Sequence, residues 1–181
     1  MSKIGKINIV IPDKVKVLLS GNTINVEGPL GKKSLSIDTD IFDLIINEGK
    51  EVSIKPKKIT QNIKRIWGMN RSLLNNAIIG ASKGYEKILE LSGVGFRAAI
   101  KGKQLNLQLG FSHDVNFDIP EGTKIEVEKQ TTIKIKGFDK QQVGMIASQI
   151  KSIRPPEPYK GKGIKEVGPV SYTHLTLPTK A

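Results

Sequence analysis

The chain has 181 residues and a formal net charge of +12, and its 38% hydrophobic and 25% charged residues exclude the disordered class of proteins. The absence of cysteine excludes disulfides, thiolate zinc sites and cysteine nucleophiles, and no apolar run approaches the length of a membrane span. A globular fold of one or two domains remains, and its charge favours a polyanionic partner, with nucleic acid ahead of membrane lipid.

Alternating apolar and polar residues fill the chain between residues 7 and 54, and glycines and prolines break the pattern into short runs. A period of two predicts antiparallel strands, here at residues 15–17, 23–26, 34–37 and 52–54. The apolar residues then recur three and four apart, which predicts one amphipathic helix from about residue 60 to residue 81.

The strand pattern returns after Gly84 and leads to a second helix. Strands are predicted at residues 88–91, 96–100, 104–109, 115–119, 124–127 and 132–135. The helix begins near Asp139, carries Val143 and Ile150 on one face, and ends before Pro155. The second half of the chain therefore repeats the order of elements in the first half.

The two halves also match when the chain is shifted against itself by 81 positions. Gly21 then falls on Gly102, and the strand at 23–26 falls on the strand at 104–107. This agreement indicates an internal duplication, with chance alignment of two strand-rich halves as the alternative. We therefore predict an α+β fold of two similar domains, in each of which antiparallel β-sheet packs with one α-helix. The expected domains are residues 1–82 and 83–153.

Three motifs resemble catalytic or nucleotide-binding sites, but none has the context that such a site needs. Residues 93–98, Gly-Val-Gly-Phe-Arg-Ala, match a dinucleotide-binding loop, which must open a helix, whereas a strand is predicted to follow here. Residues 28–34 lack the spacing of a phosphate-binding loop, and His113 with Asp114 lacks a nucleophile or a metal-ligand set. We therefore expect no enzyme activity, cofactor, metal ion or small-molecule substrate.

Basic residues are concentrated in two parts of the chain. Between residues 55 and 83 there are seven lysines or arginines and no acidic residue. That imbalance predicts a cationic helix face for phosphates, with a merely solvated basic face as the alternative. Between residues 151 and 165, basic residues are interleaved with prolines, glycines and Tyr159. Such a segment is expected to be extended and to suit RNA, although a flexible linker has a similar composition.

Six passages of the chain resemble one known family. They are residues 2–6 (Ser-Lys-Ile-Gly-Lys), 67–71 (Trp-Gly-Met-Asn-Arg), 93–98, 109–113 (Leu-Gly-Phe-Ser-His), 137–141 (Gly-Phe-Asp-Lys-Gln) and 154–164 (Arg-Pro-Pro-Glu-Pro-Tyr-Lys-Gly-Lys-Gly-Ile). The last passage is the most specific. Together they resemble the bacterial-type L6 family of large-subunit ribosomal proteins over about residues 1–165.

The resemblance implies a structural constituent of the large ribosomal subunit, which binds large-subunit rRNA near its 3′ domain and the factor-binding region. Neighbouring ribosomal proteins and translation factors would be its other partners, and the ribosome, in the cytoplasm or an organelle matrix, its location. The resemblance also implies RNA contacts in the second domain and in a basic extension at residues 154–165. The residues that match the family's contacts are Lys3, Lys6, Gly93, Gly95, Arg97, Arg154, Pro156, Tyr159, Lys160, Lys162 and Lys165.

The resemblance ends at Glu166. Residues 166–181 lack the aromatic and basic, glycine-containing tail of the family, and we expect them to be foreign sequence, with lineage variation as the alternative. A free-standing RNA-binding module is the runner-up function, and co-sedimentation with large subunits would distinguish it. A nucleotide-dependent enzyme is the third hypothesis, and it requires a helix directly after the glycine loop at residues 93–95.

Overall fold

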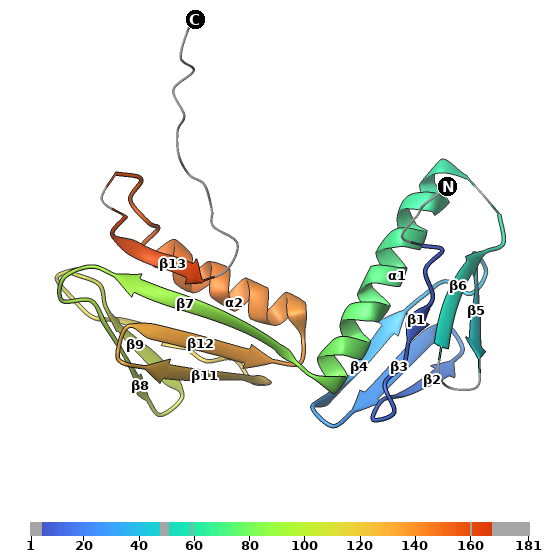
Figure 1. Cartoon of the computed structure of the whole chain (residues 1–181), viewed down its shortest axis with the longest axis horizontal. Coiled ribbons are helices and arrows are strands. Elements are labelled where there is room, and N and C mark those ends of the chain that lie inside the picture. The colour runs from blue at the N-terminus through green and yellow to red at the C-terminus, as the bar shows by residue number, and fades with distance from the viewer. Residues whose placement is uncertain (1–4, 48–50, 59, 160, 168–181) are drawn as a thin grey trace, which may run out of the picture. The chain divides into compact units, whose positions relative to one another are not determined.

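The computed structural model describes residues 5–47, 51–58, 60–159 and 161–167, and the chain divides into two compact units. The N-terminal unit comprises Met1–Tyr85 together with Phe138–Lys140. The C-terminal unit comprises Glu86–Gly137 and Gln141–Ala181. Each unit combines antiparallel sheet with a helix (Figure 1), so the fold is α+β as the sequence predicts.

In the N-terminal unit, short strands precede a long helix. The elements are β1 (Ile9–Val10), β2 (Lys16–Ser20), β3 (Thr23–Gly28), β4 (Gly31–Ser36), β5 (Phe42–Asn47), β6 (Glu51–Pro56) and α1 (Gln61–Ser82). β3 lies between β2 and β4 in one antiparallel sheet, and β6 lies between β1 and β5 in another. α1 runs along these strands (Figure 1), which places its apolar face against them.

The core of the N-terminal unit follows from the two periodicities in its sequence. Alternate residues of β3 and β6 point inward, and Val26 and Val52 are 0% and 1% exposed. On α1 the buried residues recur at helical spacing, from Trp67 through Leu74 to Ala81. These side chains form one hydrophobic cluster, whose burial stabilises the unit.

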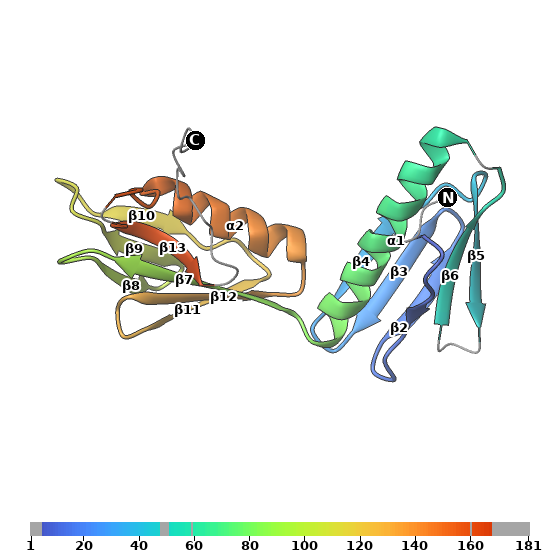
Figure 2. The ribbon, with the colours of Figure 1, turned by 45° about the horizontal axis from the view of Figure 1, so that its top comes forward.

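The C-terminal unit has the same order of elements and one strand more at its end. The elements are β7 (Tyr85–Ser92), β8 (Arg97–Lys101), β9 (Gln104–Gln108), β10 (Val115–Asp118), β11 (Thr123–Glu128), β12 (Thr132–Gly137), α2 (Lys140–Ile153) and β13 (Gly163–Val167). β9 lies between β8 and β10, and the other sheet has the order β11-β12-β7-β13. α2 lies along this second sheet (Figure 2), and its inward residues Val143 and Ile146 are buried.

The two units confirm the predicted duplication. In each, a meander of strands turns at a glycine with positive φ, +58° at Gly21 and +64° at Gly102. Both residues follow the first strand of their meander, β2 or β8. In each unit the strand before the helix, β6 or β12, lies inside its sheet. The same topology therefore occurs twice along the chain.

The structure contains three strands that were not predicted from the sequence, β1, β5 and β13, and β1 is only two residues long. β5 was not predicted, because Leu44, Ile45 and Ile46 are consecutive apolar residues without alternation. β13 was not predicted either, because it forms within a segment of glycines and charges, and it pairs with the distant β7. The helices agree with the prediction to within a few residues. Residues 168–181 lie outside the described residues, whereas Glu166 and Val167 belong to β13.

Candidate nucleic-acid interface

The turn between β7 and β8 depends on two glycines. Gly95 has φ +79°, a conformation that residues with a side chain rarely adopt. A β-carbon on Gly93 would lie 2.8 Å from the ring of Phe96, so this ring packs directly over the glycine backbone. Val94 at the tip is 95% exposed. Strand β8 follows the turn, which confirms the prediction of a strand there and excludes the dinucleotide-binding loop.

Arg154, just after the end of α2, stacks between two aromatic rings. Its guanidinium carbon lies 5.4 Å from the ring centre of Phe96 and 5.0 Å from that of Phe111. Cation–π contacts of this kind join the β7–β8 turn, the segment after β9 and the end of α2. Arg154 therefore positions three segments of the C-terminal unit at one place.

The described residues 154–159, 161 and 162, which we call the basic loop, fold back on themselves. The amide of Glu157 donates to the carbonyl of Lys162 at 2.7 Å, and the amide of Gly161 donates to the carbonyl of Glu157 at 2.9 Å. The amide of Ile164 donates to the carbonyl of Arg154 at 3.0 Å and closes the loop. The segment is thus a closed loop, whereas its prolines had led us to expect an extended arm.

β13 continues from the basic loop and fixes it to the sheet. Gly163 pairs with Ser92 in the β7 register, next to the β7–β8 turn. Ile164 is 0% exposed and so belongs to the core of the unit. Further along β13, the Glu166 carboxylate forms a salt bridge with Lys87 and accepts a hydrogen bond from its ammonium group at 2.6 Å. The basic loop is therefore held close to the β7–β8 turn at one end of the unit (Figure 1).

The basic residues near the basic loop and those of β11 and β12 differ in whether they form ion pairs. Along β11 and β12, Lys134 and Lys136 pair with Glu128 and Glu126 at 2.6 and 2.7 Å. The hydrogen bond from Lys136 lowers the pKa of the Glu126 carboxyl. Three other basic residues, Arg97, Lys162 and Lys165, are called the basic cluster here. By contrast with Lys134 and Lys136, none of them forms an ion pair within the described residues. The basic cluster is exposed, so its charges are available to a partner.

Of the predicted RNA contacts that the structure describes, all but Lys6 belong to the C-terminal unit. Pro156 is partly buried, and Tyr159 is 89% exposed on the basic loop. Lys6 is exposed but belongs to the N-terminal unit. Lys3 and Lys160 lie outside the described residues. The aromatic partners of Arg154 were not predicted from the sequence, although both lie in passages that carry the family resemblance.

Replacing Arg154 by alanine is expected to destabilise the C-terminal unit by about 1–3 kcal/mol, since two cation–π contacts are lost. Arg154→Lys should restore less than half of the loss, because an ammonium group lacks the planar surface that stacks on two rings. Urea unfolding followed by circular dichroism measures both changes. Equal unfolding midpoints for the wild type and Arg154→Ala would show that Arg154 contributes only its charge.

Some of the basic residues between 55 and 83 make contacts within the N-terminal unit. Lys57 pairs with Asp43 at 3.6 Å and donates to the carbonyl of Thr39 at 2.8 Å. Arg71 donates from Nε to the carbonyl of Ile7 at 3.3 Å. Part of the charge in this region therefore stabilises the N-terminal unit itself.

Two further observations limit the kinds of site that the described residues contain. In these parts of the chain no group of three or more His, Cys, Asp or Glu side chains could hold a metal ion. Neither α1 nor α2, the helices of the described ranges, combines the length and the hydropathy of a membrane span. Asp114, once considered a partner for His113, accepts a hydrogen bond from Gln108 at 3.2 Å.

The chain is similar to ribosomal proteins over nearly its whole length. Residues 92–167 match the family model of ribosomal protein L6. The large ribosomal subunit protein uL6 of Methylocella silvestris is 48% identical over 168 residues, which cover 93% of this chain and 94% of that protein. The uL6 proteins of Caulobacter vibrioides and Magnetococcus marinus are 49% and 44% identical, and the alignments again cover 93% of this chain and 94% of each relative. Such identity shows common ancestry, and the chain belongs to the L6 (uL6) family of ribosomal proteins.

Proposed function

We propose that this protein is a structural constituent of the large ribosomal subunit that binds large-subunit rRNA near its 3′ domain and the factor-binding region. The observation that carries the proposal is that Arg97, Lys162 and Lys165 are exposed and form no ion pair within the described residues, and that Tyr159 on the basic loop is exposed as well. Membership of the L6 family supports the ribosomal setting, because the relatives are large-subunit proteins by name. Its role is to hold RNA, and its location is the ribosome.

The basic cluster suits RNA because its cations lie on a rigid support. The strand pairing of Gly163 with Ser92 fixes the loop, and the stacked Arg154 fixes the turn. Cations held in this way bind phosphates with little loss of backbone conformational entropy. Tyr159 offers an aromatic face for an unstacked base, and Val94 is a small apolar tip that can approach a groove.

The roles of the other candidates follow from their surroundings. Gly93 and Gly95 shape the turn, Pro156 shapes the basic loop, and Arg154 positions both segments. Lys3, Lys6 and Lys160 are proposed as further phosphate contacts on the basis of the family resemblance. We propose residues 154–165 as the segment that contributes most of the RNA contacts.

The test is binding of the whole chain to a transcript of the 3′ domain of large-subunit rRNA, beside a transcript of similar length from another domain. We expect tighter binding to the 3′ domain. The logarithm of the association constant should fall with a slope of about five per tenfold increase in salt, if about six phosphates are neutralised. Equal affinity for both transcripts would contradict the proposal.

Point variants test the interface better than truncation does. Removing residues after Ile153 would also remove β13 and its buried Ile164. The loss of this strand would damage the sheet, so weaker binding could not be assigned to lost RNA contacts. Substitutions in the exposed basic cluster leave the core intact and separate binding from folding.

A further inference from the structure

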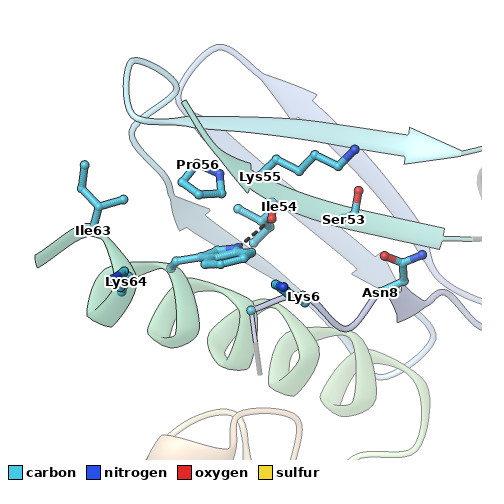
Figure 3. Close-up of a pocket in the computed structure, with 10 residues that line it drawn as sticks. Lys6, Asn8, Ser53, Ile54, Lys55, Pro56, Ile63 and Lys64 are labelled. Carbon is cyan, nitrogen blue, oxygen red and sulfur yellow. Dashed lines mark hydrogen bonds between the residues drawn. The ribbon is translucent and has the colours of Figure 1, made fainter. Parts of the chain in front are cut away.

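The N-terminal unit contains a cavity that lies outside the basic cluster and the basic loop. Its volume is about 440 Å³, a size typical of ligand-binding clefts. It lies between the start of α1, the end of β6 and the segment before β1 (Figure 3). Ile63 and Lys64 reach it from the helix, and Ile54 and Lys55 reach it from the strand.

The floor of this cavity is apolar and rigid. Trp67 is only 8% exposed, and its indole nitrogen donates to the carbonyl of Ile54 at 2.7 Å, the dashed line in Figure 3. The Gly5 backbone packs on the indole so closely that a β-carbon on Gly5 would lie 2.5 Å from the ring. Pro56 and Ile63 complete the apolar lining. A side chain inserted here would exchange water for hydrocarbon contacts.

The rim of the cavity is positively charged. Lys6, Lys55 and Lys64 all line it, and no acidic residue does. In the part of the chain that the structure describes, none of these lysines takes part in an ion pair. The first turn of α1 carries no acidic residue either, so its positive end is not neutralised there. The cavity thus has three lysines and no acidic residue around an apolar floor, and the nearest carboxylate in the strand pairing is Asp43, opposite Lys55.

The chemistry of the lining favours a peptide over a nucleotide. RNA-binding pockets hold bases by stacking on exposed aromatic or arginine planes. Here Trp67 is buried and packed against Gly5, and the cations that line the cavity are lysines. Aliphatic residues and proline instead suit a bulky apolar side chain. Lysine ammonium groups suit carboxylates as well as phosphates, so the preference for a peptide rests on the apolar lining.

From this arrangement we infer that the cavity is a second binding site, which takes an acidic segment of a partner protein. The segment inserts one bulky apolar side chain onto Ile54, Ile63 and Trp67, while its carboxylates pair with Lys55 and Lys64. The inference goes beyond the proposed rRNA binding, because the ligand is a protein segment and Lys6 is the only residue of the cavity lining among the proposed RNA contacts. The protein would then bridge RNA and a protein partner through its two units.

Trp67 is the only tryptophan of the chain, so its fluorescence reports directly on this cavity. The whole chain is titrated with a short synthetic peptide of alternating glutamate and leucine. A saturable change in Trp67 emission is expected. In the variant Lys55→Gln/Lys64→Gln the affinity should fall about tenfold, since two ion pairs are lost. The matched control Lys14→Gln/Lys58→Gln removes the same charge at exposed lysines that do not line the cavity, and it should bind like the wild type.

Two further ligands decide whether the site is specific. Oligoglutamate of equal charge should bind clearly more weakly than the mixed peptide, because it lacks the apolar side chain. Oligouridylate should change Trp67 emission little. The inference is overturned if the mixed peptide gives no saturable change, if oligoglutamate binds equally well, or if oligouridylate binds more tightly. None of these results depends on the basic cluster, so they leave the proposed rRNA binding untouched.

Discussion

The triple variant Arg97→Gln/Lys162→Gln/Lys165→Gln should bind the 3′-domain transcript about a hundredfold more weakly than the wild type at moderate salt. These cations are exposed and have no ion pair within the described residues, so their removal takes charge from the interface and little from the fold. The salt dependence should flatten as well, with a slope lower by about two to three, because fewer counterions are released. Filter binding or fluorescence anisotropy across a salt series measures both quantities.

A matched variant carries the same change in net charge at another end of the unit. Lys101 ends β8, on the opposite end of that strand from Arg97, and Lys103 and Lys124 border a shallow cavity together. The variant Lys101→Gln/Lys103→Gln/Lys124→Gln should keep most of the affinity. If both triple variants lose affinity equally, the RNA responds to net charge alone, and the basic cluster is not the interface.

Gly163→Ala should destabilise the C-terminal unit by about 2–5 kcal/mol, through backbone strain and overpacking together. Gly163 has φ +138°, which a residue with a β-carbon rarely adopts. That β-carbon would lie 2.6 Å from the carbonyl oxygen of Pro155 and from the α-carbon of Pro156. The basic loop would have to move, and β13 would lose part of its pairing with β7. RNA affinity should fall together with the stability of the unit, although no charge has changed.

Gly144→Ala provides the comparison for this variant. Gly144 lies inside α2, and a β-carbon there would meet nothing within 4 Å. Alanine should therefore stabilise the helix by about 0.5–1 kcal/mol. Urea unfolding by circular dichroism gives the two midpoints, and amide hydrogen exchange shows whether β7 has lost protection. Equal midpoints for Gly163→Ala and the wild type would contradict the tight closure of the basic loop.

The sequence predicted those elements whose own residues carry a periodic signal. α1 was predicted because apolar residues from Trp67 to Ala81 follow one helical face, and β3 because Ile24 and Val26 alternate with polar residues. β13 could not be predicted in this way. Ile164 is its only buried residue apart from Gly163, and its partner β7 lies far away in the sequence. Pairing between distant segments leaves little trace in local sequence.

The candidate site was predicted as a set of residues, but their different roles were not. Arg154 was predicted as an RNA contact, and the structure shows its guanidinium stacked on Phe96 and Phe111. These rings come from segments that only the fold brings together. Similarly, the seven basic residues between 55 and 83 read as one surface, while Lys57 in fact pairs with Asp43. Composition shows how much charge there is, and geometry shows which charges are free.

Co-sedimentation with large ribosomal subunits lacking their own L6-family protein tests the central proposal most directly. The whole chain should bind these particles in a one-to-one ratio and stay bound through a high-salt wash, while the basic-cluster triple variant washes off. Small subunits should retain neither protein. Equal retention on large and small subunits, lost for both at the same salt concentration, would contradict a specific place in the large subunit.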